Sequence, residues 1–292
     1  MIAGIHHVAI AVRDLESALA FYRDTLGLGV GERADVADQG VHAALLPREE
    51  GEIELLEPTS PAGGVARFLE RRGEGPHHLC LETSDVAAAL AQAKAADLPL
   101  IDQIPRPGLA GLIGFLHPKA CCGLLVELAQ RQGHAERPGP QPGGVRAVGI
   151  DTVYVVAKEI EAAGATLARN FGGRLTPARD DTRLEARGVT VWLGKSRITV
   201  LGPGDSSGPS DVTRFLADRG EGLYGLGLCV KDFRGALRHL ASAGISVKVT
   251  GTETTPLACL EASRTHGVNL FLCPDAPTAK SCQEPQRGET KP

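Results

Sequence analysis

The sequence predicts an α+β fold in which one βαβββ module occurs four times. First, the stretch His6–Leu19 has a copy at His77–Leu90, in which each matching residue lies 71 positions later. Second, each stretch is followed by a strand-like run that contains a glutamate. Third, the apolar frame of the first half returns after residue 147. Self-similarity of this kind indicates duplicated structural units.

The first module begins with an alternating strand over residues 4–12 and continues with a helix. Asp14 is the expected N-cap of this helix because it comes directly before a helical stripe of apolar residues. Two strands over residues 41–46 and 53–56 flank a polar turn. A short helix over residues 65–71 then leads to the second module.

The second module repeats this order of elements. The expected elements are a strand over residues 77–82, a helix capped near Asp85 that ends near Ala95, a loop at residues 105–108 and strands around residues 113–115 and 124–128. Two such modules can pair their sheets into one shared concave surface.

The chain starts again after residues 132–147, which are rich in proline and glycine and which we interpret as a linker. Gly149–Val153 matches Gly4–Val8, and Gly267–Leu272 matches Gly123–Leu128. The predicted organisation is a first domain at residues 1–131, the linker, a second domain at residues 148–274 and a disordered tail at residues 275–292.

The composition is typical of a soluble globular protein, with 42% hydrophobic and 23% charged residues in a chain of 292. A net charge of −4 argues against a polyanion binder, so no nucleic-acid partner is expected. No apolar run approaches the roughly 20 residues of a membrane span, so no membrane contact is expected. The seven cysteines are an odd number without a C-x-x-C pair, which favours a reducing, cytoplasmic location.

Four residues of metal-ligating type occupy matching places in the two modules of the first half: His7, Glu54, His78 and Glu127. At the corresponding positions the second half has Thr152, Thr199, Gly225 and Phe271. Because the apolar frame persists without these four side chains, folding does not require them. Their joint absence indicates that they share a function, which only the first half performs.

Two imidazoles and two carboxylates suit a divalent Co, Mn, Zn, Ni or Fe ion, and such a site can keep coordination positions open for a substrate. Each histidine belongs to a His-His pair whose side chains alternate across the strand. His7 and His78 are the symmetric choice of ligands, while the spacing alone leaves His6 and His77 open as alternatives.

Paired βαβββ modules with this ligand order resemble the vicinal oxygen chelate superfamily. Residues 4–130 are similar to its methylmalonyl-CoA epimerases, while the second half shares only the frame. The resemblance depends on the stretches Ile5–Val12, Ile53–Pro58, Gly73–Leu79, Ile101–Gln103 with Pro105–Gly108, and Phe115–Lys119 with Leu125–Leu128. It implies two glyoxalase-like domains with curved mixed sheets, the second of them without metal ligands.

The resemblance also implies an activity and the residues that perform it. The reaction interconverts (2R)- and (2S)-methylmalonyl-CoA by proton abstraction and reprotonation at C2, through a metal-stabilised enolate. The resemblance makes His7, Glu54, His78 and Glu127 the metal ligands. Inversion needs one acid–base group on each face of C2. The candidates are Glu127 and Asp38, which stands where family members have a glutamate.

Two further residues are candidate substrate contacts. His117 and Lys119 follow a strand near the last metal ligand and could contact the acyl carboxylate or the CoA phosphates. The expected partner is therefore an acyl-CoA substrate, bound by a monomer or a homodimer.

Three other functions compete with this interpretation. A glyoxalase I-type lactoylglutathione lyase uses a similar ligand set, although the Arg-Pro-Gly and His-Pro-Lys stretches favour the epimerase. A non-catalytic binding or resistance-type protein would keep the metal and lack a working base, and the short side chain of Asp38 supports that reading. Extradiol dioxygenases also have four modules, but they use two histidines and one carboxylate in the later pair of modules, which is bare here.

Overall fold

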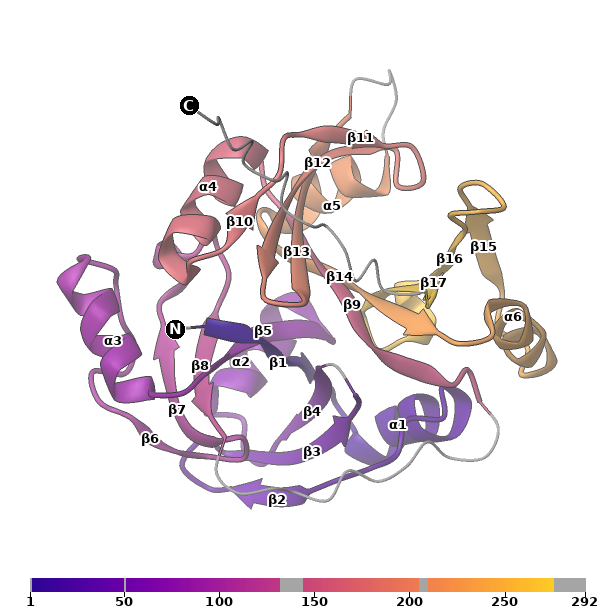
Figure 1. The fold of residues 1–292 in the computed structure, drawn as a ribbon. Coiled ribbons are helices and arrows are strands. Elements are labelled where there is room, and N and C mark those ends of the chain that lie inside the picture. Colours follow the sequence, from indigo (N-terminus) through magenta and orange to yellow (C-terminus); the bar gives the residue numbers. More distant parts are fainter. Residues whose placement is uncertain (1, 50, 132–143, 205–209, 276–292) are drawn as a thin grey trace, which may run out of the picture.

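The computed structural model describes residues 2–49, 51–131, 144–204 and 210–275. These residues form two curved mixed sheets with helices packed against them, which confirms the predicted α+β class (Figure 1). Most of the predicted linker and tail, residues 132–143 and 276–292, lies outside the described residues. The domain boundaries drawn at those stretches therefore stay a prediction.

The first sheet contains two modules that meet at its centre. Its strand order is β2-β3-β4-β1-β5-β8-β7-β6, with β1 antiparallel to β5 and parallel to β4. The bounds are β1 Ile2–Ala11, β2 Arg33–Val36, β3 Val41–Pro47, β4 Glu52–Pro58, β5 Gly75–Thr83, β6 Arg106–Gly108, β7 Gly111–Leu116 and β8 Val126–Gln130. The predicted loop at residues 105–108 is wrong in part, because three of its residues form the edge strand β6.

The helices of the first half begin where the sequence predicts. Asp14 accepts a hydrogen bond from the backbone N–H of Ser17, and Asp85 accepts one from Ala88, so both aspartates are N-caps. The helices are α1 Leu15–Leu19, the π-helical turn η1 Ala20–Thr25, α2 Gly64–Arg72, α3 Val86–Ala95 and the short turn η2 Pro118–Ala120. The first helix is thus interrupted after five residues, which the apolar stripe did not predict.

The second sheet repeats the first, with the order β10-β12-β13-β9-β14-β17-β16-β15, and β11 pairs with β12. The strands are β9 Ala147–Val156, β10 Arg174–Leu175, β11 Arg179–Asp181, β12 Ala186–Leu193, β13 Ser196–Pro203, β14 Gly222–Val230, β15 Val247–Thr250, β16 Leu257–Leu260 and β17 Asn269–Pro274. The helices are α4 Ile160–Phe171, α5 Asp211–Arg219, α6 Phe233–Ser242 and the turn η3 Ala262–Arg264.

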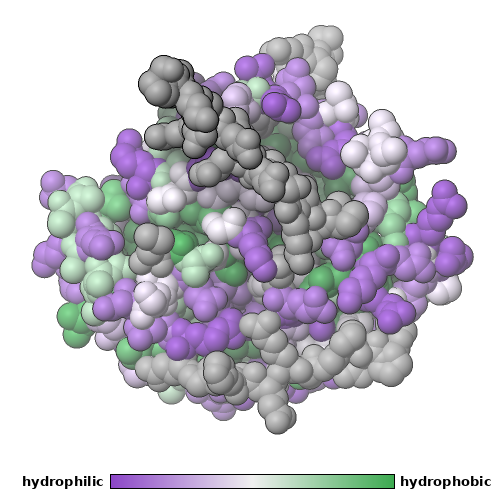
Figure 2. All heavy atoms as spheres, in the orientation of Figure 1, coloured by the Kyte–Doolittle hydropathy of each residue, from purple (hydrophilic) through white to green (hydrophobic). Residues whose placement is uncertain are grey.

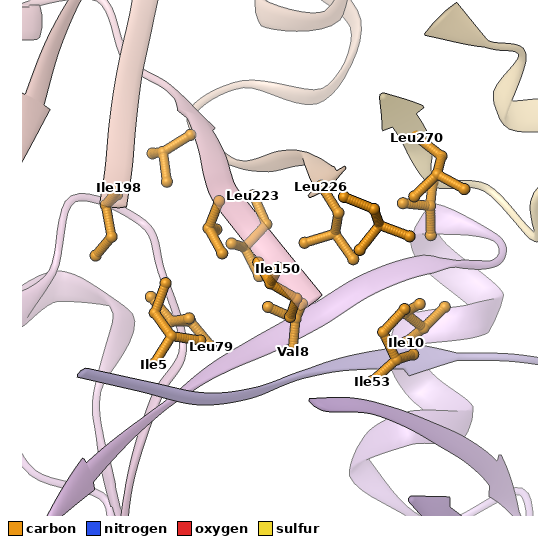
Figure 3. Close-up of a cluster of buried hydrophobic side chains, with 14 of the residues drawn as sticks. Ile5, Val8, Ile10, Ile53, Leu79, Ile150, Ile198, Leu223, Leu226 and Leu270 are labelled. Atoms are coloured by element: carbon orange, nitrogen blue, oxygen red, sulfur yellow. The ribbon is translucent and has the colours of Figure 1, made fainter. Parts of the chain in front are cut away.

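The two halves bury one apolar core between them. Side chains such as Val8 and Ile10 of the first sheet point toward Leu226 and Leu270 of the second (Figure 3). Buried aliphatic side chains each contribute about 1.5–3 kcal/mol when they are removed from water. This shared core stabilises the contact between the halves.

Hydrogen bonds reinforce this contact at both ends of the core. The hydroxyl of Tyr22, which is fully buried, donates to the carbonyl of Thr265 over 3.0 Å. At the other end, the backbone N–H of Ile5 donates to the Ser196 hydroxyl over 3.0 Å. On the face shown in Figure 2, hydrophilic side chains are interspersed with hydrophobic ones. Among the described helices, none is both long and apolar enough to cross a membrane.

The contact between the halves makes one glycine indispensable. Gly267 has a φ of +77°, and a Cβ atom there would lie 1.8 Å from the carbonyl oxygen of Glu74. We expect Gly267→Ala to lower the free energy of unfolding by at least about 2 kcal/mol, because both the left-handed backbone and the close approach exclude a side chain. Urea unfolding measures this loss. The matched control is Gly64→Ala, where a Cβ atom meets nothing within 4 Å; equal stability of both variants would contradict the prediction.

Candidate metal centre

The four predicted ligands come from the four adjacent central strands of the first sheet. Ala9 of β1 pairs with Glu54 of β4 on one side and with His78 of β5 on the other. Across the next ladder, Cys80 of β5 pairs with Glu127 of β8. His7 lies two residues before Ala9, so strand alternation places it on the same face as Ala9. The ladders therefore bring residues far apart in the sequence onto one patch of the concave face.

The side chains of these residues converge. His7 Nε2 lies 3.3 Å from Glu54 Oε2 and 3.1 Å from Glu127 Oε2. His78 Nε2 lies 3.7 Å and 3.2 Å from the same two oxygens, and the two histidine nitrogens are 3.3 Å apart. All four residues are buried, with at most 6% of any of them exposed.

The donor set fits a divalent metal ion. Ligand atoms about 2.0–2.2 Å from a metal lie about 2.8–3.6 Å apart at octahedral or tetrahedral angles, which is close to the observed spacing. Glu127 Oε2 is buried, and no hydrogen bond of acceptable geometry reaches it from the described residues. A buried carboxylate oxygen in this state needs a positive partner. Mixed nitrogen and oxygen ligands suit Zn, Co, Mn, Ni or Fe.

The pKa shifts of His7 and Glu127 show that the site stabilises positive charge. Burial alone lowers the pKa of His7, but Cys80, Glu54 and Glu127 raise it well above 6.5. Burial alone raises the pKa of Glu127, yet its contacts with His7 and His78 bring it well below its ordinary value. The carboxylates thus favour the positively charged form of His7. A divalent cation would take the place of the proton that this form carries.

The prediction that the two side chains of each His-His pair alternate across the strand is wrong, because register irregularities at His6 and His77 in the β1–β5 ladder bring the two rings of each pair together. His6 Nδ1 is 2.9 Å from His7 Nδ1, and His77 Nδ1 is 3.0 Å from His78 Nδ1. Burial and the neighbouring His78 lower the pKa of His77 to about 3, so it is neutral at pH 7. Partners on the second ring nitrogen orient a metal-ligating histidine. This geometry favours His7 and His78 as the ligands and gives His6 and His77 an orienting role, which the doublet alone did not reveal.

Asp38 lies at the rim of the concave face, in the turn between β2 and β3. Its Oδ2 accepts a hydrogen bond from Arg106 Nη1 over 3.0 Å. The Arg106 guanidinium lies over the Phe115 ring at 5.5 Å, and this ring meets the edge of the His78 ring at 5.2 Å. Asp102 holds Arg106 from the other side at 3.3 Å. This contact of Arg106 was not predicted from the sequence, although Arg106 lies in one of the stretches on which the resemblance depends.

His117 and Lys119 lie on the turn between β7 and β8. His117 Nδ1 accepts a hydrogen bond from the backbone N–H of Lys119 over 3.1 Å, so the ring caps the short turn η2. The Lys119 side chain is exposed.

A cavity of about 520 Å³ lies beside α1 and β2, and none of the four predicted ligands lines it.

The second half fills the corresponding place with aromatic rings. Tyr154 pairs with Thr199 and Gly225, as Ala9 does with Glu54 and His78. The ring of Tyr154 packs against that of Phe271 with centroids 5.1 Å apart. The ladders therefore give the same correspondence as the sequence repeat, and an apolar cluster stands where the first half has its four polar side chains.

Metal binding is expected to stabilise the protein. A ligand present at 1,000 times its Kd adds about 4 kcal/mol to the stability of the native state. For a protein of this size that corresponds to a rise in Tm of the order of 10 °C. Differential scanning calorimetry with and without Mn²⁺, an ion that prefers nitrogen and oxygen ligands to sulfur, measures the shift, which His7→Ala should abolish. An equal shift in the His7→Ala protein would show that the stabilising ion binds elsewhere.

Comparison with known proteins agrees with the fold. The sequence profile of the Glyoxalase/Bleomycin resistance protein/Dioxygenase superfamily matches residues 6–115. An ethylmalonyl-CoA/methylmalonyl-CoA epimerase of Cereibacter sphaeroides is 43% identical over 133 residues, which cover 44% of this chain and 99% of that protein. The mitochondrial methylmalonyl-CoA epimerase of Homo sapiens is 38% identical over 128 residues, covering 43% of this chain and 73% of that protein.

Over nearly the whole chain, the similarity to a solved structure is one of fold alone. A triple mutant of 4-hydroxymandelate synthase from Streptomyces coelicolor superposes with a TM-score of 0.71 at 18% identity, covering 94% of this chain and 92% of that chain. Two glyoxalase-like units in one chain therefore have a structural precedent. From the profile match, the relatives and the paired modules, we conclude that the chain belongs to the Glyoxalase/Bleomycin resistance protein/Dioxygenase superfamily.

Proposed function

We propose that this protein is a metal-dependent epimerase that interconverts (2R)- and (2S)-methylmalonyl-CoA. The observation that carries the proposal is the convergence of His7, Glu54, His78 and Glu127 on one buried point of the concave face. The similarity of residues in the first half to named epimerases supports the choice of substrate.

The chemistry explains why such a centre is useful. The C2 proton lies between a thioester and a carboxylate, and its removal places negative charge on the thioester oxygen. A divalent ion of Co, Mn, Zn, Ni or Fe, held by the four ligands, supplies Lewis-acid stabilisation of that charge. The four ligand side chains are buried, which keeps electrostatic interactions at the site strong.

We propose that two carboxylates exchange the proton. Inversion needs a base on one face of C2 and an acid on the other. We assign these roles to Glu127, within the metal centre, and Asp38, at the rim. Aspartate is one methylene shorter than glutamate, and errors in position of about 1 Å can cost a hundredfold in rate. The hydrogen bond from Arg106 fixes the direction of the Asp38 carboxylate, and Arg106 is in turn held by Asp102.

The remaining contacts concern the CoA moiety. Lys119 is exposed on the turn after β7, where its ammonium can attract the CoA phosphates as a point charge. His117 is engaged in capping that turn, so we propose that it shapes the turn and that Lys119 makes the contact. The shared core places the second half against the first, and we propose that the active form is a monomer.

The proposal is tested by isotope exchange. The full-length protein, loaded in turn with Co²⁺, Mn²⁺, Ni²⁺ or Zn²⁺, is incubated with (2R)- or (2S)-methylmalonyl-CoA in D₂O, and NMR follows deuterium at C2. Exchange into both epimers is the expected result. No exchange with any of these ions would overturn the proposal. Turnover of the methylglyoxal–glutathione hemithioacetal in place of methylmalonyl-CoA would instead identify a lactoylglutathione lyase.

The role of Arg106 gives a further prediction. Arg106→Leu should lower kcat by about 10- to 100-fold with a smaller change in KM, because the Asp38 carboxylate loses the contact that positions it. Arg106→Lys should recover part of the loss. Arg33→Leu is the matched control, since it removes an ion pair with Glu16 on the surface. Steady-state kinetics of the three variants test whether Arg106 positions Asp38. Full activity in Arg106→Leu would show that Asp38 does not need the hydrogen bond from Arg106.

A further inference from the structure

We propose that the second half contains a separate binding site for a thiophilic divalent cation of the Zn²⁺ type, formed by Asp151, Cys229 and Cys273. The three residues lie on β9, β14 and β17, which are neighbours at the centre of the second sheet. These strands correspond to β1, β5 and β8, which provide three of the four ligands in the first half. The proposed site is independent of the activity proposed above.

The register of the strands brings the donor atoms together. Cys229 pairs directly with Cys273 across the parallel ladder of β14 and β17, and with Gly149 on β9. An irregularity in the β9–β14 ladder between Gly227 and Leu228 places Asp151 beside the two cysteines. Phe271 occupies the position that corresponds to Glu127 of the first half, and it lies two residues before Cys273 on the same face. The proposed site is therefore displaced along the concave face toward one end of the sheet.

The distances between the donor atoms match tetrahedral coordination. The two Sγ atoms are 3.7 Å apart, and Cys229 Sγ lies 3.5 Å from Asp151 Oδ1. With metal–sulfur bonds of about 2.3 Å and metal–oxygen bonds of about 2.0 Å, tetrahedral angles give about 3.8 Å between sulfurs and about 3.5 Å between sulfur and oxygen. The sulfurs are much farther apart than the roughly 2.05 Å of a disulfide bond.

The surrounding charges complete the argument. A guanidinium nitrogen of Arg197 is paired with Asp151 Oδ1, and the Thr152 hydroxyl donates to Oδ2 over 2.6 Å. Such partners orient a ligating carboxylate. Two thiolates and one carboxylate carry three negative charges, and a divalent cation with Arg197 balances them. All three donor residues are only half-buried, so an ion can reach them from solvent.

Co²⁺ provides a direct probe, because cobalt bound to thiolates gives an intense near-ultraviolet absorption. The full-length protein, kept reduced, is titrated with Co²⁺ and the bound metal is counted. We expect two equivalents and the thiolate band. Cys229→Ser combined with Cys273→Ser should lose the band and one equivalent. Cys259→Ser is the matched control, a half-buried cysteine on the neighbouring strand β16, and should keep both.

Two further measurements keep the test decisive. The His7→Ala and His78→Ala double variant should lose the other equivalent and retain the thiolate band, which separates this proposal from the one for the first half. In the unaltered protein, Zn²⁺ should slow alkylation of Cys229 and Cys273 about tenfold or more, without affecting Cys259. A band that survives the paired cysteine substitutions, or equal alkylation rates with and without Zn²⁺, would overturn the proposal.

Discussion

His7→Ala is expected to lower the rate of methylmalonyl-CoA epimerisation by about 10³-fold or more, and it should do so by removing bound metal. His7 Nε2 lies within 3.3 Å of three other proposed ligand atoms, those of Glu54, Glu127 and His78. Glu54 Oε2 lies that close to His7 but is 3.7 Å from His78 Nε2. Removing the electrostatic stabilisation of a developing oxyanion typically costs about 10²–10³ in kcat, and loss of the ion removes a still larger share. Metal analysis of the dialysed protein and steady-state kinetics measure the two losses together.

The control for this variant lies at the matching position of the second half. Thr152→Ala should leave metal content in the first half and the rate of epimerisation unchanged, because Thr152 contributes no ligand there. His7→Ala protein that retains metal and full activity would contradict the assignment of the centre. So would a Thr152→Ala protein with the same loss as His7→Ala.

Asp38→Asn should separate proton exchange from inversion. If Asp38 and Glu127 face opposite sides of C2, the variant keeps one working base and loses the other. We expect inversion to fall by about 10²–10⁴-fold, the range typical of a general acid–base group. One epimer should still exchange its C2 proton with D₂O through Glu127, without changing configuration. Following deuterium and configuration separately for each epimer tests this directly.

Two companion variants sharpen the result. Asp38→Glu should keep or raise the rate of inversion, since it introduces the glutamate that the methylmalonyl-CoA epimerases are expected to have at this position. Asp35→Asn is the control, because Asp35 is an exposed aspartate on the neighbouring strand β2 and pairs with His42. If Asp38→Asn inverts both epimers at the full rate, Asp38 is a turn residue that binds Arg106 and nothing more.

Much of the fold followed from patterns that the sequence displays locally. The N-caps Asp14 and Asp85 precede apolar stripes, and the central strands alternate, so periodicity and capping predicted these elements correctly. The edge strand β6 was missed because three residues with a proline carry almost no periodic signal. The π-helical turn η1 interrupts the first helix, and its Tyr22 donates a hydrogen bond to Thr265 of the second half, a contact that local periodicity does not encode.

The candidate site was predictable for a different reason. The chain contains its own comparison, because the second half keeps the frame and loses the four polar residues. The role of Arg106 could not be predicted, since its partners Asp38 and Asp102 meet it only through the folded ladders. The cluster of Asp151, Cys229 and Cys273 was hidden for the same reason: the cysteines look like ordinary strand residues until the register sets them side by side.

The central claim is that the first half inverts C2 of methylmalonyl-CoA with the help of a bound divalent ion. The most direct measurement begins with (2R)-methylmalonyl-CoA and follows the appearance of the (2S) epimer, with chelator-treated full-length protein before and after metal is returned. Our account predicts no inversion by the treated protein, and a nearly equal mixture of epimers once Co²⁺, Mn²⁺, Ni²⁺ or Zn²⁺ is added. Unchanged inversion by metal-free protein, or none with any of these ions bound, would contradict it.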